Sequence, residues 1–499
     1  MRRRGALPTS VPASAPVAVV VATALVLTAC GGVRGTPGAA GVGDPYFPKL
    51  GNGGYDVSHY GLTLDYEPDS GRLKGEAVIT ARATQELSAF HLDLAGLKPD
   101  KVTVGGKGAR FNTVGRELVV RPPDDLDKGE TFRTTVRYSG TPQTITDPDG
   151  SEEGWLRTAD GGAVALGEPT GSMAWFPGNH HPSDKAAYDI EVTVPKGLKA
   201  VSNGELKGTR ETKSGGGGRR TTFRWHSAEP MASYLATVAI GPYETKTWKT
   251  KSGLPIYTAV SVSEAAEGTE GTEGTEGTED SAGALAQIPD IIAWQERRFG
   301  PYPFSSVGAI VVGEDDAGYA LETQTKPVFP GVPDTELMVH EFAHQWFGNS
   351  VSPKTWQDMW LNEGFATYAE WLWAEDRGGD SAQETFDAVY AGGEGSGGVW
   401  AFPPAKPPGP DRVFDTPVYV RGAMVLHKVR QVVGDDAFFR ILRGWPSTYR
   451  HANADTDDFI AYVEKQAGDK GGDKGGDEGG DLDAVWDAWL RGEGKPKQP

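Results

Sequence analysis

Hydrophobic and polar residues alternate along the first half of the chain, from about residue 55 to residue 250. Turn residues interrupt this alternation at short intervals, which is typical of strands joined by tight connections. The alternating positions include Leu62 and Leu64, Val102 and Val104, Phe132, Val136 and Tyr138, and Tyr188, Ile190, Val192 and Val194. The pattern predicts an antiparallel β-sandwich domain, to which we assign residues 45–252.

From about residue 285 the hydrophobic pattern takes the period of a helix. It predicts helices over 335–347, 361–376 and 419–433, each ending near a glycine. We therefore assign residues 253–466 to a second, mostly helical domain, which makes the fold class α+β. Residues 467–499 contain a low-complexity Gly/Asp run and then a short closing helix over 482–490.

Two segments consist of short repeats that cannot form a hydrophobic core. Residues 267–280 repeat Glu-Gly-Thr, and residues 468–481 repeat Gly-Gly-Asp with occasional Lys or Glu. Such composition predicts disordered surface insertions. The chain of 499 residues has a formal net charge of −19, which argues against a nucleic-acid partner because phosphate binding requires a basic face.

The N-terminus has the pattern of an export signal. Basic residues at 2–4 precede an apolar run over 17–27, and Leu27-Thr28-Ala29-Cys30 resembles a bacterial lipobox that is cut before its cysteine. The pattern predicts a lipoprotein signal peptide over 1–29, lipid on Cys30, a Gly-rich flexible tether over 30–44, and anchoring to the outer face of a bacterial cell membrane. An ordinary secretory signal that happens to contain cysteine is the alternative. No later apolar run approaches the roughly 20 residues of a spanning helix.

His340-Glu341-Phe342-Ala343-His344 places two histidines four residues apart within a predicted helix. Side chains at this spacing share one helix face and can bind one metal ion, with Glu341 beside it as a candidate general base. The alternative is two histidines on a solvated face. Glu363 lies on the next predicted helix, with 18 residues between it and His344, and can return as a third ligand. Two imidazoles and one carboxylate leave a zinc ion one open position for water, as in catalytic sites.

Residues 339–373, VHEFAHQWFGNSVSPKTWQDMWLNEGFATYAEWLW, closely resemble the zinc-binding helices of the aminopeptidase N family. The resemblance extends over about residues 55–466. It implies a thermolysin-like zinc-peptidase domain that holds one Zn²⁺ ion and packs against the sheet domain. It also implies a member that lacks the long helical C-terminal domain of many relatives.

Three further motifs carry the resemblance. Tyr319-Ala320-Leu321-Glu322-Thr323 stands where the family has Gly-Ala-Met-Glu-Asn, and differs from it at the first, third and fifth positions. The resemblance implies that Glu322, together with Glu168 of Glu168-Pro169-Thr170, binds the free N-terminal ammonium of a substrate. Tyr419-Val420-Arg421-Gly422 matches Tyr-x-Lys-Gly with arginine for lysine, and implies that Tyr419 donates a hydrogen bond to the oxyanion.

Three other histidines, His180, His181 and His427, are candidates for a second metal site or for structural roles. Where the family usually has Phe-Asp-Glu-Pro, this chain has Asn179-His180-His181-Pro182. His180 and His181 lack partners at ligand spacing, so a structural or surface role is favoured over a second metal site. For His427 we likewise expect a core or surface role.

These features together predict a zinc-dependent aminopeptidase that removes N-terminal residues from peptides with a free N-terminus. The same features leave two main alternatives open, and nothing in the sequence demands a third, epoxide hydrolysis of the kind carried out by the leukotriene-hydrolysing members of the aminopeptidase N family. A zinc endopeptidase would have no use for the ammonium-binding Glu322, and a non-catalytic surface binding protein with a vestigial zinc site would be expected to have lost Glu341 or Tyr419.

Overall fold

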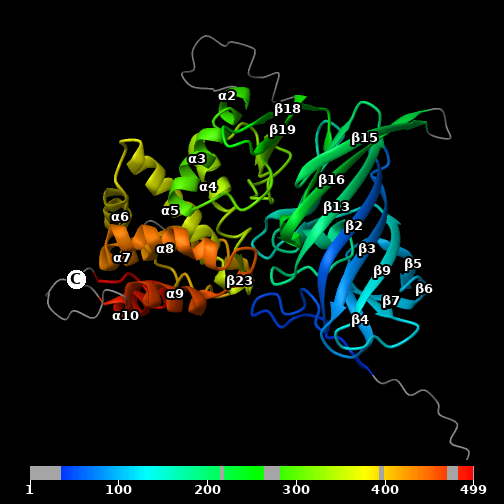
Figure 1. Ribbon diagram of the computed structural model, residues 1–499, viewed down its shortest axis with the longest axis horizontal. Coiled ribbons are helices and arrows are strands. Elements are labelled where there is room, and N and C mark those ends of the chain that lie inside the picture. The colour runs from blue at the N-terminus through cyan, green and yellow to red at the C-terminus, as the bar shows by residue number, and fades with distance from the viewer. Residues whose placement is uncertain (1–34, 214–217, 263–280, 393–397, 469–480, 498–499) are drawn as a thin grey trace, which may run out of the picture. The chain divides into compact units, whose positions relative to one another are not determined.

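The computed structural model describes residues 35–213, 218–262, 281–392, 398–468 and 481–497 (Figure 1). The predicted signal peptide, Cys30, the Glu-Gly-Thr insertion over 267–280 and most of the Gly/Asp run lie outside these residues. Within the described ranges, no helix is both long enough and apolar enough to cross a membrane. Strands dominate the first half of the chain and helices the second, so the α+β class is confirmed.

The described residues of the first half form three β-sheets. The largest has the order β15-β16-β13-β2-β3-β9-β5-β6, with β15 (Glu205–Lys213), β16 (Arg219–Ala232), β13 (Lys185–Pro195), β2 (Tyr55–Glu67), β3 (Arg72–Ala83), β9 (Thr131–Gly140), β5 (Lys98–Val104) and β6 (Lys107–Gly108). The alternating residues of β13 predicted from the sequence (Tyr188, Ile190, Val192 and Val194) are all buried. Neighbouring strands are antiparallel as predicted, except that β13 runs parallel to β2.

Two smaller sheets complete this domain. One has the order β1-β4-β8-β7, with β1 (Thr36–Pro37), β4 (Leu87–Asp93), β8 (Glu117–Arg121) and β7 (Arg110–Val114). The other has the order β10-β11-β12-β17-β14, with β10 (Thr144–Thr146), β11 (Glu152–Arg157), β12 (Ala163–Leu166), β17 (Val238–Gly241) and β14 (Lys199–Ser202). The second of these matters for function, because the connections beside β11 and β12 lead to the cavity described below.

A further sheet spans the predicted boundary at residue 253. This four-stranded sheet has the order β18-β19-β20-β21, with β18 (Tyr243–Lys249), β19 (Pro255–Ser261), β20 (Val307–Val312) and β21 (Val328–Pro330). β18 lies before residue 253 and pairs with β19, which follows it, and the boundary at residue 253 stays a prediction. The sequence could not show this because β18 has the same alternating pattern as the strands before it.

Helices form the rest of the second domain. They are α2 (Ser281–Leu285), α3 (Ile288–Phe299), α4 (Thr335–Ala343), α5 (Trp360–Asp376), α6 (Ala382–Ala391), α7 (Gly422–Val433), α8 (Asp435–Thr448), α9 (Thr456–Gly468) and α10 (Leu482–Val485). Short β22 (Ser352–Pro353) and β23 (Asn453–Ala454) pair with each other. Three of the predicted helices correspond to α4, α5 and α7, and the closing helix to α10 and the helical turn Trp486–Leu490. That turn packs into the second domain, where its carbonyl groups bind Arg421.

The segment predicted to be a flexible tether is partly ordered. Residues 35–44 belong to the fold, since β1 pairs with β4 and the Gly35 amide donates to Asp125. Asp44, at the end of this segment, is buried and accepts hydrogen bonds from the backbone amide of Trp356 (2.9 Å) and from His181 (3.2 Å). The glycine-rich composition predicted flexibility, but it also permits the close backbone approach that this packing needs.

Two glycines let the helices that carry the predicted site approach closely. A Cβ atom on Gly364 of α5 would lie 2.9 Å from the backbone of Gly422, the first residue of α7. The two helices therefore meet backbone to backbone. This contact brings Glu363, which precedes Gly364, near Tyr419, which lies one turn before Gly422.

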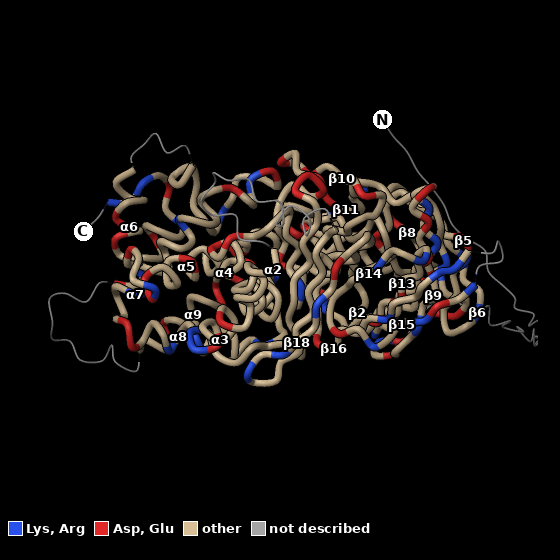
Figure 2. Tube along the Cα trace, turned by 90° about the horizontal axis from the view of Figure 1, so that it is seen from above, with Lys and Arg blue, Asp and Glu red and all other residues tan. Residues whose placement is uncertain are grey.

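Charged residues are distributed over both domains (Figure 2). Basic residues gather near β5, β6 and β9, at one end of the sheet domain, whereas acidic residues mark the connection next to β10 and β11. That connection holds Asp147 and Asp149, and it lies at the cavity between the sheet domain and the helices.

Candidate active site

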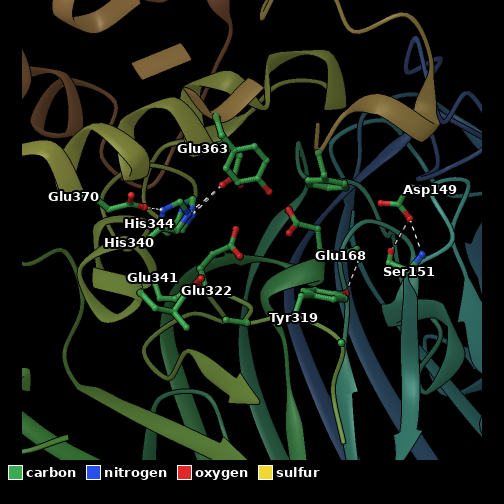
Figure 3. A pocket seen from close by; sticks show the side chains of 15 residues that line it. Asp149, Ser151, Glu168, Tyr319, Glu322, His340, Glu341, His344, Glu363 and Glu370 are labelled. Carbon is green, nitrogen blue, oxygen red and sulfur yellow. Dashed lines mark hydrogen bonds and ion pairs between the residues drawn. The ribbon is translucent and has the colours of Figure 1, made fainter. Parts of the chain in front are cut away.

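The cavity has a volume of about 500 Å³ and is lined by residues of both domains. The seven described residues that the sequence singled out for chemistry all line it: Glu168, Glu322, His340, Glu341, His344, Glu363 and Tyr419. Figure 3 shows the labelled members of this set facing the same space. The sequence therefore predicted which residues converge here, although they come from five separate stretches of chain.

The two histidines are presented by α4. Asp334 caps the start of this helix by accepting a hydrogen bond from the Leu337 amide (2.8 Å), and the helix ends at Ala343, so that His344 is its C-terminal cap. Glu363 lies in the first turn of α5. One carboxylate oxygen of Glu363 lies 3.3 Å from Nε2 of His340 and 3.4 Å from Nε2 of His344.

The donor chemistry of this group fits a zinc ion. Nδ1 of His344 donates to the Phe347 carbonyl (3.1 Å), and Nδ1 of His340 donates to the Glu370 carboxylate. With Nδ1 protonated, each ring turns its Nε2 lone pair towards the Glu363 oxygen, and the ligand atoms of the three residues all lie within 4.8 Å of one another. Two buried imidazoles and one buried carboxylate are a catalytic zinc ligand set.

The charge balance around the ligands also favours a cation. Burial would raise the pKa of Glu363, but His344 and His340 lower it to about 2, so this ligand is a carboxylate. Burial would lower the pKa of His344, but Glu363 and Glu322 raise it to about 9. The surroundings therefore stabilise positive charge at the point where the three side chains meet.

Glu341 directly follows His340 on α4, and its side chain is buried, with 5% of the residue exposed. Burial raises its pKa, the two histidines oppose this, and the result is a pKa of about 7. Its Oε2 atom is buried and has no hydrogen-bond partner among the described residues. A carboxylate in this state can accept a proton from a molecule in the cavity and return it.

Glu322 and Glu168 are two further buried acidic residues, and each has a side-chain oxygen without a hydrogen-bond partner among the described residues. Glu322 is 3% exposed, and its backbone carbonyl accepts from the side-chain amide of Asn349 (2.6 Å), just after α4. Glu168 is 7% exposed, follows β12, and its carbonyl accepts from the hydroxyl of Tyr319 (3.2 Å). In each, the Oε1 atom is buried without a partner among the described residues. Burial, reinforced by the neighbouring carboxylates, raises the pKa of Glu168 well above its ordinary value.

Tyr419 completes the group from the helical turn Pro417–Arg421. Its ring lies nearly parallel to that of His340, with a centroid distance of 6.2 Å and an interplanar angle of 17°. Burial and then the nearby carboxylates raise the pKa of Tyr419 well above its ordinary value. The hydroxyl therefore remains protonated and can donate a hydrogen bond into the cavity.

Sequence reasoning missed several residues that line the cavity. Glu370 could have been found, because it lies seven residues after Glu363 on the same helix and hence on the same face. Asp149 and Ser151 had no sequence signal, since they lie on the short connection from β10 to β11. Gly318, Leu337 and Phe414 also line the cavity and were not singled out.

The three other histidines that the sequence analysis considered lie away from the cavity. His180 is buried against the Phe176 carbonyl (3.0 Å), and His181 against Asp44. His427 is buried between Tyr368 (3.1 Å) and Gln383 (3.0 Å). Structural roles, as expected from the sequence, account for all three.

Comparisons with known proteins match this architecture. Residues 56–235 match the peptidase M1 N-terminal domain, and residues 333–489 match the peptidase family M1 domain. An M1 zinc metallopeptidase of Deinococcus radiodurans is 30% identical, covers 92% of this chain and 98% of its own, and superimposes with a TM-score of 0.76. A mutant of that enzyme bound to the substrate Tyr-Ser-Ala superimposes with a TM-score of 0.78 at 29% identity.

Longer relatives match with lower identity. Aminopeptidase 2 of Candida albicans is 24% identical over 473 residues, which is 88% of this chain and 47% of the relative. Leukotriene A-4 hydrolase of Xenopus laevis is 23% identical over 89% of this chain and 72% of the relative. The chain thus spans about half the length of several curated aminopeptidases that it matches.

Proposed function

The chain belongs to the M1 family of zinc metallopeptidases, and we propose from this premise that it is an aminopeptidase that removes single residues from the free N-terminus of peptides. The observation that carries the proposal is the position of Glu168 and Glu322. Each presents a buried oxygen without a partner to the cavity that also holds the zinc-binding group. A buried carboxylate without a partner is costly, so the pair favours a ligand that brings a positive charge.

His340, His344 and Glu363 would hold the zinc ion. When bound there, zinc supplies a Lewis acid that polarises the scissile carbonyl and lowers the pKa of a water molecule towards 7. Glu370 and the Phe347 carbonyl hold the two imidazoles in the orientation that this requires.

The other side chains then have separate roles. Glu168 and Glu322 bind the ammonium group and so fix the distance from the peptide N-terminus to the scissile bond. Glu341 accepts the proton of the attacking water and passes it to the leaving amine, a role that suits a pKa of about 7. Tyr419 donates a hydrogen bond to the carbonyl oxygen as negative charge develops on it.

Two alternatives remain testable. A zinc endopeptidase would leave Glu168 and Glu322 without a positively charged partner, because an internal peptide segment has no ammonium group. A vestigial binding protein would not need Glu341 and Tyr419 in the same cavity. The test is mass spectrometry of an unmodified decapeptide and its N-acetylated form after incubation with the purified zinc-loaded protein. We expect products shortened one residue at a time from the free N-terminus, and none from the acetylated peptide. Internal cleavage of both peptides would show an endopeptidase.

We also propose that the protein is exported and carries lipid on Cys30, on the basis of the lipobox pattern alone. Labelled palmitate supplied to expressing bacteria should enter the wild type and be absent from Cys30→Ser. Equal labelling of the two proteins would refute lipidation at this residue.

A further inference from the structure

One end of the active-site cavity lies beyond Glu168, on the side away from the zinc-binding group. Figure 3 shows Asp149 and Ser151 at this end, with Tyr319 and Glu168 between them and the two histidines. Gly318 and Phe414 also line the cavity. Zinc binding, ammonium binding, proton transfer and oxyanion stabilisation do not involve Asp149, Ser151, Gly318 or Phe414.

The proposed function determines what enters this end. The first residue of a bound peptide has three groups on its α-carbon: the ammonium, the carbonyl and the side chain. Glu168 and Glu322 bind the ammonium, and the carbonyl must lie at the zinc-binding group. The side chain is then left to the rest of the cavity, which includes the end at Asp149 (Figure 3).

The chemistry of this end favours a long cationic side chain. One carboxylate oxygen of Asp149 accepts from the Ser151 amide (2.9 Å) and hydroxyl (2.7 Å), which fixes the connection between β10 and β11. Its other oxygen makes no hydrogen bond within the described ranges, and Asp149 is an exposed residue that lines the cavity. The aromatic rings of Tyr319 and Phe414 also line the cavity, and aromatic faces attract guanidinium and ammonium groups.

The cavity as a whole is strongly acidic. Its lining contains six carboxylic residues and neither lysine nor arginine among the described residues: Asp149, Glu168, Glu322, Glu341, Glu363 and Glu370. Five of these residues surround the zinc-binding group, where burial, the two histidines or the proposed ammonium account for them, and Asp149 stands apart from them (Figure 3). Asp149 makes no ion pair among the described residues.

There is also room for a long side chain. A Cβ atom added to Gly318, an exposed residue that lines the cavity, would meet no other atom within 4 Å, so the cavity is open on this side. A bulky residue at position 318 would fill that space and leave room only for a small first residue.

We propose that Asp149 is a specificity-determining residue that selects peptides with arginine or lysine at the N-terminus, an inference that rests on the proposed aminopeptidase function. Arginine is favoured over lysine, because its planar guanidinium can lie against an aromatic ring while it donates a hydrogen bond to the free oxygen of Asp149. N-terminal aspartate and glutamate are rejected by repulsion from the same carboxylate.

The test compares kcat/KM for aminoacyl anilides with arginine, methionine, alanine and glutamate as the first residue. We expect the wild type to favour arginine over methionine by about tenfold, the size of one charge-assisted hydrogen bond. Asp149→Asn keeps the oxygen that accepts from Ser151 and removes the charge. It should lower the arginine value about tenfold and leave the methionine value within about twofold.

Two further variants sharpen the test. Asp69→Asn makes the same charge change at an exposed turn of the sheet domain, outside the cavity lining, and should leave both values unchanged. Gly318→Leu should lower the arginine and methionine values by more than about tenfold and spare the alanine value, because it fills the space for a long side chain.

The possible failures can be told apart. If Asp149→Asn leaves the ratio of arginine to methionine unchanged while the wild type hydrolyses both substrates, Asp149 does not determine specificity and the proposed function still stands. If the wild type hydrolyses no free-amine substrate, the proposed function is wrong and this inference is wrong with it.

Discussion

Removing the hydroxyl of Tyr419 tests the proposed chemistry at a single atom. The ring lies nearly parallel to His340, and the helical turn that carries it is held by Arg421, the buried arginine two residues later. Tyr419→Phe therefore keeps the ring in place and removes only the donor. Since burial and nearby carboxylates raise the pKa of this hydroxyl well above its ordinary value, the wild type has a proton to donate at any working pH.

The expected effect follows from the role of the donor. A hydrogen bond to a developing oxyanion typically contributes about 2.7–4 kcal/mol to transition-state stabilisation. At about 1.4 kcal/mol for each factor of ten, this corresponds to a fall in kcat of about 10²–10³-fold. KM should change little, because the hydrogen bond strengthens only as charge develops on the oxygen.

The assay measures kcat and KM on a free-amine aminoacyl anilide, together with zinc content by metal analysis. Tyr449→Phe is the matched control, because Tyr449 is also half-buried but ends α8 outside the cavity lining. A fall in kcat of less than about tenfold for Tyr419→Phe, with zinc retained, would refute the assignment of Tyr419 as the oxyanion donor.

Three further changes test the supports of the site. Glu370→Ala removes the partner of His340 Nδ1 and should weaken zinc binding about 10–100-fold in competition with a chromophoric chelator. Arg421→Met leaves buried carbonyl oxygens without a donor and should lower the free energy of unfolding by about 3 kcal/mol or more, measured by urea denaturation. Burial would raise the pKa of Asp44, but the hydrogen bond from His181 and three backbone amides lower it below its ordinary value. Its stabilising contribution is therefore present above about pH 4 and lost as pH falls through the folded-state pKa, so Asp44→Asn should reduce stability at pH 7 and flatten the loss of stability on acidification. Unchanged zinc affinity would contradict the role of Glu370, and an unchanged urea midpoint would contradict that of Arg421. An unchanged dependence of stability on pH would contradict the role of Asp44.

The zinc-binding group could be predicted from the sequence because its geometry is local. His340 and His344 share a face of one helix, and Glu363 lies in the first turn of the next. Tyr419 reaches the same place through the contact between Gly364 and Gly422. The sequence has no local pattern that predicts this contact. It became predictable only through the resemblance to a family with the same motif order.

Other features depend on packing that no local pattern records. Asp149 reaches the cavity because the connection from β10 to β11 lies over it, and a single aspartate in a turn has no distinguishing sequence signal. β18 alternates like the strands of the first domain, yet it pairs with β19 in the second. Residues 35–44 have the composition of a linker, yet Asp44 is buried between His181 and Trp356.

The most direct test of the aminopeptidase proposal compares a free-amine aminoacyl anilide with its N-acetylated counterpart on the zinc-loaded wild type. Two carboxylates that each contribute a charge-assisted hydrogen bond of about 1.5–3 kcal/mol predict a kcat/KM ratio of about 10²–10⁴ in favour of the free amine. Glu322→Gln should reduce this ratio by lowering the free-amine value alone. Equal kcat/KM values for the two substrates on the wild type would contradict recognition of the ammonium group and with it the aminopeptidase assignment.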